Sequence, residues 1–176
     1  MAPPRFLAPE PLRPQHEIAP FSNGRHASLD EWLRQRAQAS EGLSARTYVT
    51  CAAVAVNRVV GYYAISTAAA HRVSMPSAKL RKGLPEQVPL LLLGRLAVDA
   101  ASQGQGLGAA LLADALRRCV AASAIAGVRG VIAHAIDDEA VRFYLRHGFT
   151  AAPPLGERTM LMPIEVLRAA VDRPKG

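Results

Sequence analysis

The residues whose types and spacing are best suited to chemistry form the glycine-rich stretch Gln103–Gly108, which holds three of the 13 glycines. An apolar run over 88–98 precedes this stretch, and apolar residues recur at every fourth position from Leu107, which predicts a strand, a turn and a helix in this order. Such a turn exposes several backbone N–H groups at the positive end of a helix, where they can bind a phosphate or a pyrophosphate. The glycines also let ligand oxygens approach the backbone closely.

Three ligand classes compete for this stretch. A P-loop would end in Gly-Lys-Ser/Thr, but Ala109 and Ala110 occupy those positions. A dinucleotide-binding loop is formally matched from Gly104 onward, although no acidic residue follows about 20 positions later and a predicted hairpin precedes the loop in place of a βαβ repeat. A third pattern, Gln/Arg-x-x-Gly-x-Gly/Ala after a strand, is typical of the pyrophosphate loop of acyltransferases, and residues 103–108 match it fully. A glycine-rich turn that binds nothing is the remaining alternative.

The composition of the chain limits the class of protein. Its 176 residues are half hydrophobic, which fits one domain with a real core and is too apolar for a disordered chain. Cys51 and Cys119 cannot form a disulfide framework, and we expect them to be small core residues in a reducing compartment. The chain has no apolar run of about 18 residues that would span a membrane, and its N-terminus lacks the pattern of a signal peptide. These features predict a cytoplasmic location.

The charge of the chain points to an anionic partner. Lys and Arg total 21 and Asp and Glu total 14, so the formal net charge is +7. An excess of this size is compatible with a nucleic acid, a phosphorylated cofactor or an acidic lipid.

Local patterns predict the elements that must position the glycine-rich turn. Before the turn we expect a helix over 29–40 with Ser28 and Glu31 as a capping box, a hairpin of 46–56 and 59–67 around Asn57-Arg58, a long loop or short helix over 68–87, and a strand over 88–98. After the turn we expect a helix of about 18 residues from Leu107 that Gly127 ends, and a strand over 128–135. A short helix from Asp137 or Asp138 to His147, with Gly148 after it, and further strand residues at Phe149 and 158–163 complete the domain. The order predicts a single α/β (α+β) domain with helices flanking a mixed central β-sheet.

The two ends of the chain are predicted to lie outside this domain. Residues 1–20 hold six of the 13 prolines, so they cannot form a helix and are expected to wrap the surface or stay loose. The domain is predicted to span 21–165. Residues 166–176 are predicted to form a tail that frays after Leu167.

Six stretches carry a resemblance to a known family. They are Leu29-Asp30-Glu31-Trp32-Leu33, Arg46-Thr47-Tyr48-Val49, Val60-Gly61-Tyr62-Tyr63, Leu93-Gly94-Arg95-Leu96-Ala97-Val98-Asp99, Gln103–Gly108 and Phe143-Tyr144-Leu145-Arg146-His147-Gly148-Phe149. Through them, over roughly residues 20–163, the chain resembles the GNAT N-acetyltransferase superfamily. Gly-Arg-Leu-Ala-Val-Asp and Phe-Tyr-x-x-His-Gly-Phe resemble more narrowly the GNAT toxins of bacterial type II toxin–antitoxin systems, which acetylate the amino group of aminoacyl-tRNA.

The resemblance implies an acetyl-CoA site without a metal ion. The pantetheine would lie along the strand Leu96, Ala97 and Val98, where a backbone amide facing the thioester carbonyl would act as an oxyanion donor. The pyrophosphate would lie on Gln103, Gly104, Gln105, Gly106, Leu107 and Gly108, and Phe143 is also assigned to the acetyl-CoA. Tyr144 is the predicted catalytic residue, because the resemblance directs the tyrosine at this position to the CoA sulfur, and a phenol can donate a hydrogen bond or a proton to the departing thiolate. The alternative role for Tyr144 is core filling beside Phe143.

The acceptor is predicted from what the sequence lacks and from its charge. It offers no clear general base, and we expect Asp99 to be a cap or turn residue. A free α-amine has a pKa of about 7.7–8, and an ester lowers it further, so aminoacyl-tRNA needs positioning more than a strong base. A lysine ε-amine, with a pKa near 10.4, would need more help. The sequence therefore mildly favours an α-amine acceptor.

Basic residues are available to contact the phosphates of a tRNA. Those assigned to this role are Arg81, Lys82, Arg95, Arg142 and Arg146, with Arg72, Lys79 and His147 close to them in sequence. A solvated surface is the alternative for each, and a buried ion pair is the alternative for Arg95. Trp32 is expected to pack its helix, and His134 to be a hydrogen-bonded histidine, in the core or supporting a neighbouring site residue, and not a ligand itself. No set of residues has the spacing of a metal site.

The leading functional prediction is an acetyl-CoA-dependent N-acetyltransferase that acetylates aminoacyl-tRNA and blocks translation. The resemblance implies a homodimer restrained by a ribbon–helix–helix antitoxin, and operator DNA reached through that antitoxin. Two alternatives stay open. One is a GNAT enzyme for a small-molecule or protein amine, and the other is a non-catalytic module that binds CoA or a partner protein.

Overall fold

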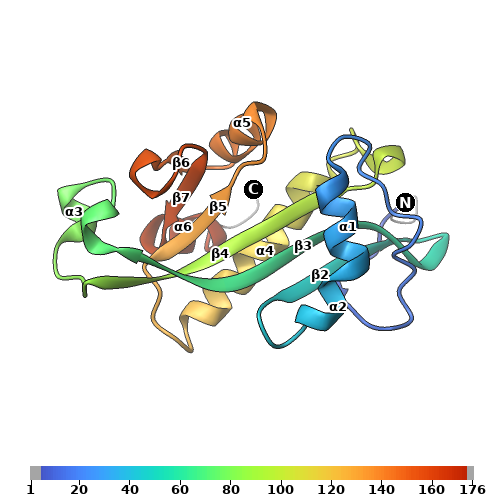
Figure 1. Cartoon of the computed structure of the whole chain (residues 1–176), viewed down its shortest axis with the longest axis horizontal. Coiled ribbons are helices and arrows are strands. Elements are labelled where there is room, and N and C mark those ends of the chain that lie inside the picture. Colours follow the sequence, from blue (N-terminus) through green and yellow to red (C-terminus); the bar gives the residue numbers. More distant parts are fainter. Residues whose placement is uncertain (1–4, 174–176) are drawn as a thin grey trace. The chain divides into compact units, whose positions relative to one another are not determined.

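The computed structural model describes residues 5–173. Helices are interspersed among the strands along the chain (Figure 1). In order, the elements are β1 (Glu10–Pro11), α1 (Ala27–Gln35), α2 (Ala37–Ser40), β2 (Arg46–Ala52), β3 (Ala55–His71), η1 (Arg72–Ser74), α3 (Ala78–Arg81), β4 (Gln87–Val98), η2 (Ala100–Ser102), α4 (Leu107–Ser123), β5 (Gly130–His134), α5 (Asp138–Arg146), β6 (Thr150–Ala151), η3 (Pro153–Leu155), β7 (Thr159–Pro163) and α6 (Ile164–Val171).

The strands form one seven-stranded sheet in the order β1-β2-β3-β4-β5-β7-β6. β2 pairs antiparallel with β1 and β3, and β7 pairs antiparallel with β5 and β6. β4 and β5 are parallel, so the chain needs a long crossover between them, which contains α4. The predicted α/β class with a mixed central sheet is confirmed.

One compact unit comprises the described residues up to Ser66 together with Gly94–Ala115. Its core gathers Leu33 of α1, Val49 of β2 and Tyr62 of β3, and the partly buried Leu29 and Trp32 pack against this cluster. Leu29, Trp32 and Leu33 return at helical spacing, so they lie on one side of α1 and can all face the strands. Cys51 of β2 is also buried in this core, as predicted.

The second compact unit comprises Thr67–Leu93 and the described residues from Leu116 onward. Its core gathers Met75, Val88, Leu90, Ile132 and Leu161. Within this unit α6 packs against β5 and β7. The other cysteine, Cys119, is buried here and is also a free thiol.

The predicted hairpin exists, but its turn was placed wrongly. The strands β2 and β3 turn at Ala53-Val54, and the Val54 side chain at the tip is 99% exposed. Asn57 and Arg58 lie inside β3, where the Asn57 carbonyl accepts a hydrogen bond from the Glu17 backbone N–H. Their polar side chains suggested a turn, but they are tolerated because this part of β3 is exposed. The register also shifts at Cys51, which sequence alternation does not predict.

The first predicted helix is divided and is not capped as expected. α1 begins at Ala27, its N-cap is His26, and α2 follows after a break at Arg36. Ser28 therefore lies within the first turn and forms no capping box with Glu31. The turn before α1 is held by Asn23, whose side-chain oxygen accepts hydrogen bonds from the N–H groups of Arg25 and His26.

The N-terminal segment adopts one of its two predicted alternatives, and the C-terminal end is more ordered than predicted. Within the described part of residues 1–20, β1 pairs with β2, and Leu12 and His16 are buried, so the segment wraps the surface and does not stay loose. The predicted tail from residue 166 contains most of α6, which continues past Leu167 to Val171 and whose side toward β5 and β7 carries buried Leu167. Residues 1–4 and 174–176 lie outside the described part of the chain. The long helix α4 ends at Ser123, before Gly127.

Candidate active site

The glycine-rich loop is anchored by polar side chains at its beginning. Asp99 is 7% exposed, and its carboxylate accepts hydrogen bonds from the backbone N–H groups of Ser22 and Ala101 at 3.1 Å each. It therefore caps the short helix η2, as expected for a cap or turn residue. The Gln103 side-chain amide donates to the carbonyls of Asn23 (2.8 Å) and Val98 (2.9 Å). Gln103 thus ties the loop to the end of β4, and its side-chain N–H donors are used within the protein.

The next part of the loop is open on one side. Gly104 and Gly106 have φ angles of +73° and +79°, which other residues adopt only with strain. A Cβ atom added to either glycine would meet no heavy atom within 4 Å. The helix α4 then begins at Leu107, whose side chain is buried. The loop therefore offers bare backbone and free space at a helix N-terminus, which is what a pyrophosphate needs.

The strand before the loop presents alternate backbone groups to its two edges. The Asp99 N–H donates to the Val60 carbonyl of β3 at 2.8 Å. Successive residues of an extended strand point their N–H groups to opposite edges, so the N–H groups of Leu96 and Val98 point away from β3. The β4–β5 ladder ends at Leu93 and does not use them. These two amides are therefore not used by either ladder of β4 and could donate to the polar groups of a ligand.

Arg95 lies on an aromatic stack. Its guanidinium carbon is 4.6 Å from the centre of the Trp32 ring, and Trp32 stacks on Tyr62 with centroids 6.0 Å apart and planes 9° apart. The Tyr62 hydroxyl donates to the Leu29 carbonyl at 2.7 Å, and burial raises the pKa of Tyr62 above its ordinary value. Arg95 is thus held by a cation–π contact and is partly exposed, so the buried ion pair considered from the sequence is not formed. Trp32 packs its helix as predicted and also supports Arg95, which sequence reasoning missed.

Tyr144 lies on α5, a helix with both ends fixed. The Asp137 carboxylate accepts from the Ala140 N–H at 2.7 Å, and Gly148 follows the C-cap with φ +91°, as predicted. Only 6% of Tyr144 is exposed, because its ring packs edge-on against Phe149 and Phe143, with centroids 5.2 Å and 5.3 Å away. Within residues 5–173 its hydroxyl has no hydrogen-bond partner. The ring therefore fills a core, while the hydroxyl remains available to a ligand.

Burial also fixes the protonation state of Tyr144. Desolvation disfavours the phenolate and raises the pKa of Tyr144 above its ordinary value. The Tyr144 hydroxyl therefore stays protonated at neutral pH, as an ordinary tyrosine hydroxyl does, so it is available as a hydrogen-bond or proton donor and is not suited to act as a base.

This state of Tyr144 can be measured directly. In ultraviolet titrations at 295 nm, the difference between wild type and Tyr144→Phe should contain no tyrosinate signal below about pH 10, the pKa of an unperturbed tyrosine. A difference signal with its midpoint at or below that pH would show that the hydroxyl is not held in its acid form.

Among the other residues assigned from the sequence, Ala97 is buried in the core of the first compact unit, and the remaining ones are exposed or partly exposed. Phe143 contacts His147, with ring centroids 4.6 Å apart, and Arg142 and Arg146 are exposed on the same helix, four residues apart. Arg81 donates to the Met75 carbonyl at 2.9 Å, which uses one of its donors, and its neighbour Lys82 is exposed. Arg72 and Lys79 of the same segment are exposed as well.

His134 has a hydrogen-bond partner, as predicted, but it does not lie in the core. It is exposed at the end of β5, and its Nδ1 lies 2.8 Å from the Thr159 hydroxyl. Within the described residues, no group of three or more His, Cys, Asp and Glu side chains could hold a metal ion. In residues 5–173, no helix has the length and apolar character needed to cross a membrane.

Comparison with known proteins places these features in a family. The family model of the acetyltransferase (GNAT) domain matches the sequence over residues 45–151, which include the glycine-rich loop and Tyr144. A tRNA-acetylating toxin from Mycobacterium tuberculosis (strain ATCC 25618 / H37Rv) is 41% identical over 150 residues, covering 84% of this chain and 87% of that protein.

Two solved structures are similar along most of the chain. AtaT complexed with acetyl-methionyl-tRNAfMet has a TM-score of 0.84 and 27% identity, covering 93% of this chain and 98% of its own. AtaTR bound with AcCoA has a TM-score of 0.78 and 27% identity, covering 94% and 97%. The domain match, the related toxin and the shared fold agree, and this chain belongs to the GNAT acetyltransferase family.

Proposed function

We propose that this protein transfers the acetyl group of acetyl-CoA to the α-amino group of aminoacyl-tRNA and thereby blocks translation. The observation that carries the proposal is the 41% identity, over 84% of the chain, to a tRNA-acetylating toxin. AtaT, similar in fold, was solved with acetyl-methionyl-tRNAfMet, the kind of product that this reaction would give.

Residues of the first compact unit are suited to bind the donor. The pyrophosphate of acetyl-CoA is assigned to the open loop of Gly104 and Gly106, and the pantetheine to the N–H groups of Leu96 and Val98. An N–H group directed at the thioester carbonyl also stabilises the charge that develops there when the amine attacks. Backbone amides and the helix N-terminus supply partial positive charge for this binding.

Tyr144 is assigned to the leaving group. The amine nitrogen attacks the thioester carbon, a C–N bond forms, the C–S bond breaks and the amine loses a proton to solvent. The departing thiolate of CoA takes a proton, the Tyr144 hydroxyl, kept protonated by burial, can supply it, and solvent returns a proton to the phenolate. The family resemblance directs this side chain to the sulfur.

The α-amine of aminoacyl-tRNA suits a site without a dedicated base. With a pKa of about 7.7–8, lowered further by the adjacent ester, much of this amine is neutral near pH 7. Positioning the nucleophile then contributes more than deprotonating it.

The net charge of +7 supports an RNA acceptor. We assign the tRNA phosphates to Arg81, Lys82, Arg95, Arg142 and Arg146. Arg95 has the most specific support, because Trp32 holds its guanidinium in place and leaves it partly exposed.

Arg95→Ala should weaken binding of charged tRNA about fivefold at low salt and reduce the slope of log K against log salt concentration by about 1. The physical reason is the loss of one phosphate contact. Filter binding or fluorescence anisotropy over a salt series measures both quantities. Arg46→Ala is the matched control, since Arg46 is exposed and already paired with Glu41 at 3.2 Å. An unchanged salt slope in Arg95→Ala would remove Arg95 from the RNA interface.

The proposal extends to partners and location. A toxin of this kind must be restrained in its own cell, and we assign that role to a ribbon–helix–helix antitoxin that also binds operator DNA. The active form is a homodimer, as the family resemblance implies, and its substrate places it in the cytoplasm.

The atom that is acetylated identifies the function. After incubation with acetyl-CoA and charged tRNA, nuclease digestion should release aminoacyl-adenosine that is heavier by one acetyl group on its α-nitrogen, as measured by mass spectrometry. An acetyl group on a nucleobase, or on small amines alone, would assign the enzyme to a different substrate class.

A further inference from the structure

The N-terminal segment brings a cation to the glycine-rich loop. Its backbone is fixed beside β2, because the Leu7 N–H donates to the Cys51 carbonyl at 2.9 Å and the Ala53 N–H donates to the Arg5 carbonyl at 3.0 Å. Phe6 and Ala52 form an antiparallel bridge between these two bonds. Arg5 is therefore held at the end of β2, although it precedes every helix and strand of the fold.

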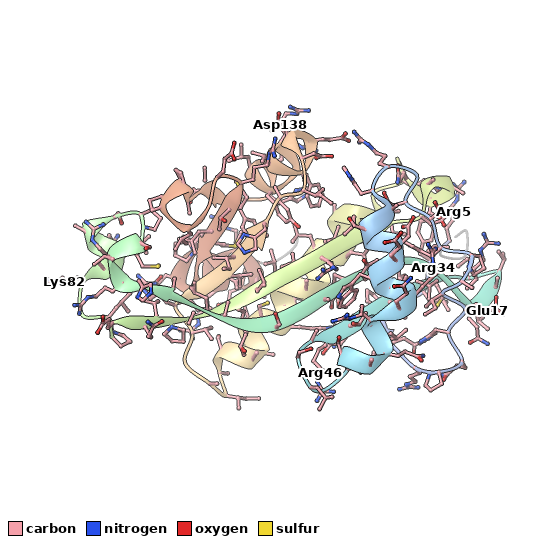
Figure 2. All side chains as sticks on the ribbon, in the orientation of Figure 1. Arg5, Glu17, Arg34, Arg46, Lys82 and Asp138 are labelled. Carbon is pink, nitrogen blue, oxygen red and sulfur yellow. The ribbon has the colours of Figure 1, made fainter. Side chains whose placement is uncertain are left out.

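The Arg5 side chain reaches the loop itself. Its Nη1 donates to the Gln105 side-chain oxygen at 2.8 Å, and Figure 2 shows Arg5 beside the loop that leads into α4. Both residues are exposed. Gln105 lies between Gly104 and Gly106, the two positions with open space around them. The guanidinium is thus placed next to the assigned pyrophosphate site.

The charge of Arg5 is not neutralised by this contact. Gln105 is an uncharged partner, and within residues 5–173 no carboxylate forms an ion pair with Arg5. A guanidinium has five N–H donors in a planar fork that matches phosphate oxygens, and the bond to Gln105 uses one. CoA carries a pyrophosphate and a 3′-phosphate with a charge of about −2, more negative charge than neutral backbone amides compensate.

We propose that Arg5 binds a phosphate group of CoA and that Gln105 is a positioning residue that directs its guanidinium. This inference rests on the proposed use of acetyl-CoA. It assigns a role to the proline-rich segment, which carries a cofactor contact in addition to covering the edge of the sheet.

The test is the affinity for CoA and for dephospho-CoA, measured by calorimetry with the full-length protein. Arg5→Ala should raise the Kd for CoA about tenfold, because a charge-assisted hydrogen bond is lost, and Arg5→Lys should recover part of the loss. Gln105→Ala should raise it less, about threefold, and should add little in the double variant. A loss for CoA alone assigns Arg5 to the 3′-phosphate, and equal losses for both ligands assign it to the pyrophosphate; either result supports the proposal.

Arg13→Ala is the matched control. It removes the same charge from the same segment, but Arg13 follows Leu12, which bonds to Thr47 near the opposite end of β2. Because Arg5 is exposed, its replacement should leave the melting temperature unchanged. The proposal is overturned if the Kd for CoA stays within twofold in Arg5→Ala, or if Arg13→Ala weakens binding equally. If wild type itself fails to bind CoA, the proposed function fails as well.

Discussion

Tyr144→Phe is expected to slow acetyl transfer by about a hundredfold or more, the range in which general acids contribute. The substitution removes only the hydroxyl, and the aromatic packing against Phe143 and Phe149 is kept. Without the proton donor, the thiolate must leave unassisted. Since the hydroxyl has no hydrogen-bond partner within residues 5–173, the free energy of unfolding should hardly change.

Single-turnover kinetics with saturating acetyl-CoA and charged tRNA measure this effect on the chemical step. The affinity for CoA and the melting temperature should match those of wild type. Tyr62→Phe is the matched control, because it removes a hydroxyl that bonds to the Leu29 carbonyl, and it should lower stability by about 1 kcal/mol while leaving the chemical step intact. A Tyr144→Phe rate within threefold of wild type would exclude Tyr144 as the acid.

Gly106→Val is expected to weaken CoA binding about 50-fold or more. The φ angle of +79° is strained for a β-branched residue, and the new side chain would enter the open space where the pyrophosphate is assigned. Losing one or two charge-assisted hydrogen bonds from the loop accounts for an effect of this size. Calorimetric titration with CoA provides the measurement.

Gly83→Val separates the effect of backbone strain from the effect of a side chain placed in the assigned CoA site. Gly83 has φ +73° and, like Gly106, no heavy atom within 4 Å of an added Cβ, so the backbone strain is matched. It lies between α3 and β4, outside the assigned CoA site. Both variants should lose similar stability, but only Gly106→Val should lose CoA affinity. Similar CoA affinities in the two variants would remove the loop from the CoA site.

Periodic segments of the fold could be predicted from the sequence, and segments fixed by distant pairing could not. The apolar run over 88–98 and the four-residue repeat from Leu107 predicted β4 and α4 because burial enforces those periods. The turn at Ala53-Val54 was missed because neither residue favours a turn; the register of β2 against β3 places it there. The strand at Glu10–Pro11 was missed because proline is a poor strand former, although a short edge strand tolerates it.

In the candidate site, too, short motifs could be assigned from the sequence, whereas contacts between distant segments could not. The site assignments of Gln103–Gly108 and Tyr144 remain predictions, and they rest on short motifs of neighbouring residues and on the family resemblance that those motifs carry. Trp32 beneath Arg95 and Gln105 beside Arg5 join segments that are distant in sequence, and no local pattern in this single chain indicates either contact. The role of Gln103 was predicted only in part, because its side chain binds the Asn23 and Val98 carbonyls.

Two anionic partners thus have separate proposed sites. We assign the CoA phosphates to backbone amides of the loop with Arg5 beside them, and the tRNA phosphates to Arg81, Lys82, Arg95, Arg142 and Arg146. The Arg5 and Arg95 variants test these assignments separately, Arg5 for a CoA phosphate and Arg95 for a tRNA phosphate.

The most direct test of the central claim is the transfer of labelled acetyl from acetyl-CoA into a bulk pool of charged tRNA. We predict that acid-precipitable label accumulates on charged tRNA, stays absent from deacylated tRNA, and is released by mild alkali as N-acetyl amino acid. If charged and deacylated tRNA both stay unlabelled while a small amine or a lysine peptide is acetylated, the account of the acceptor is wrong.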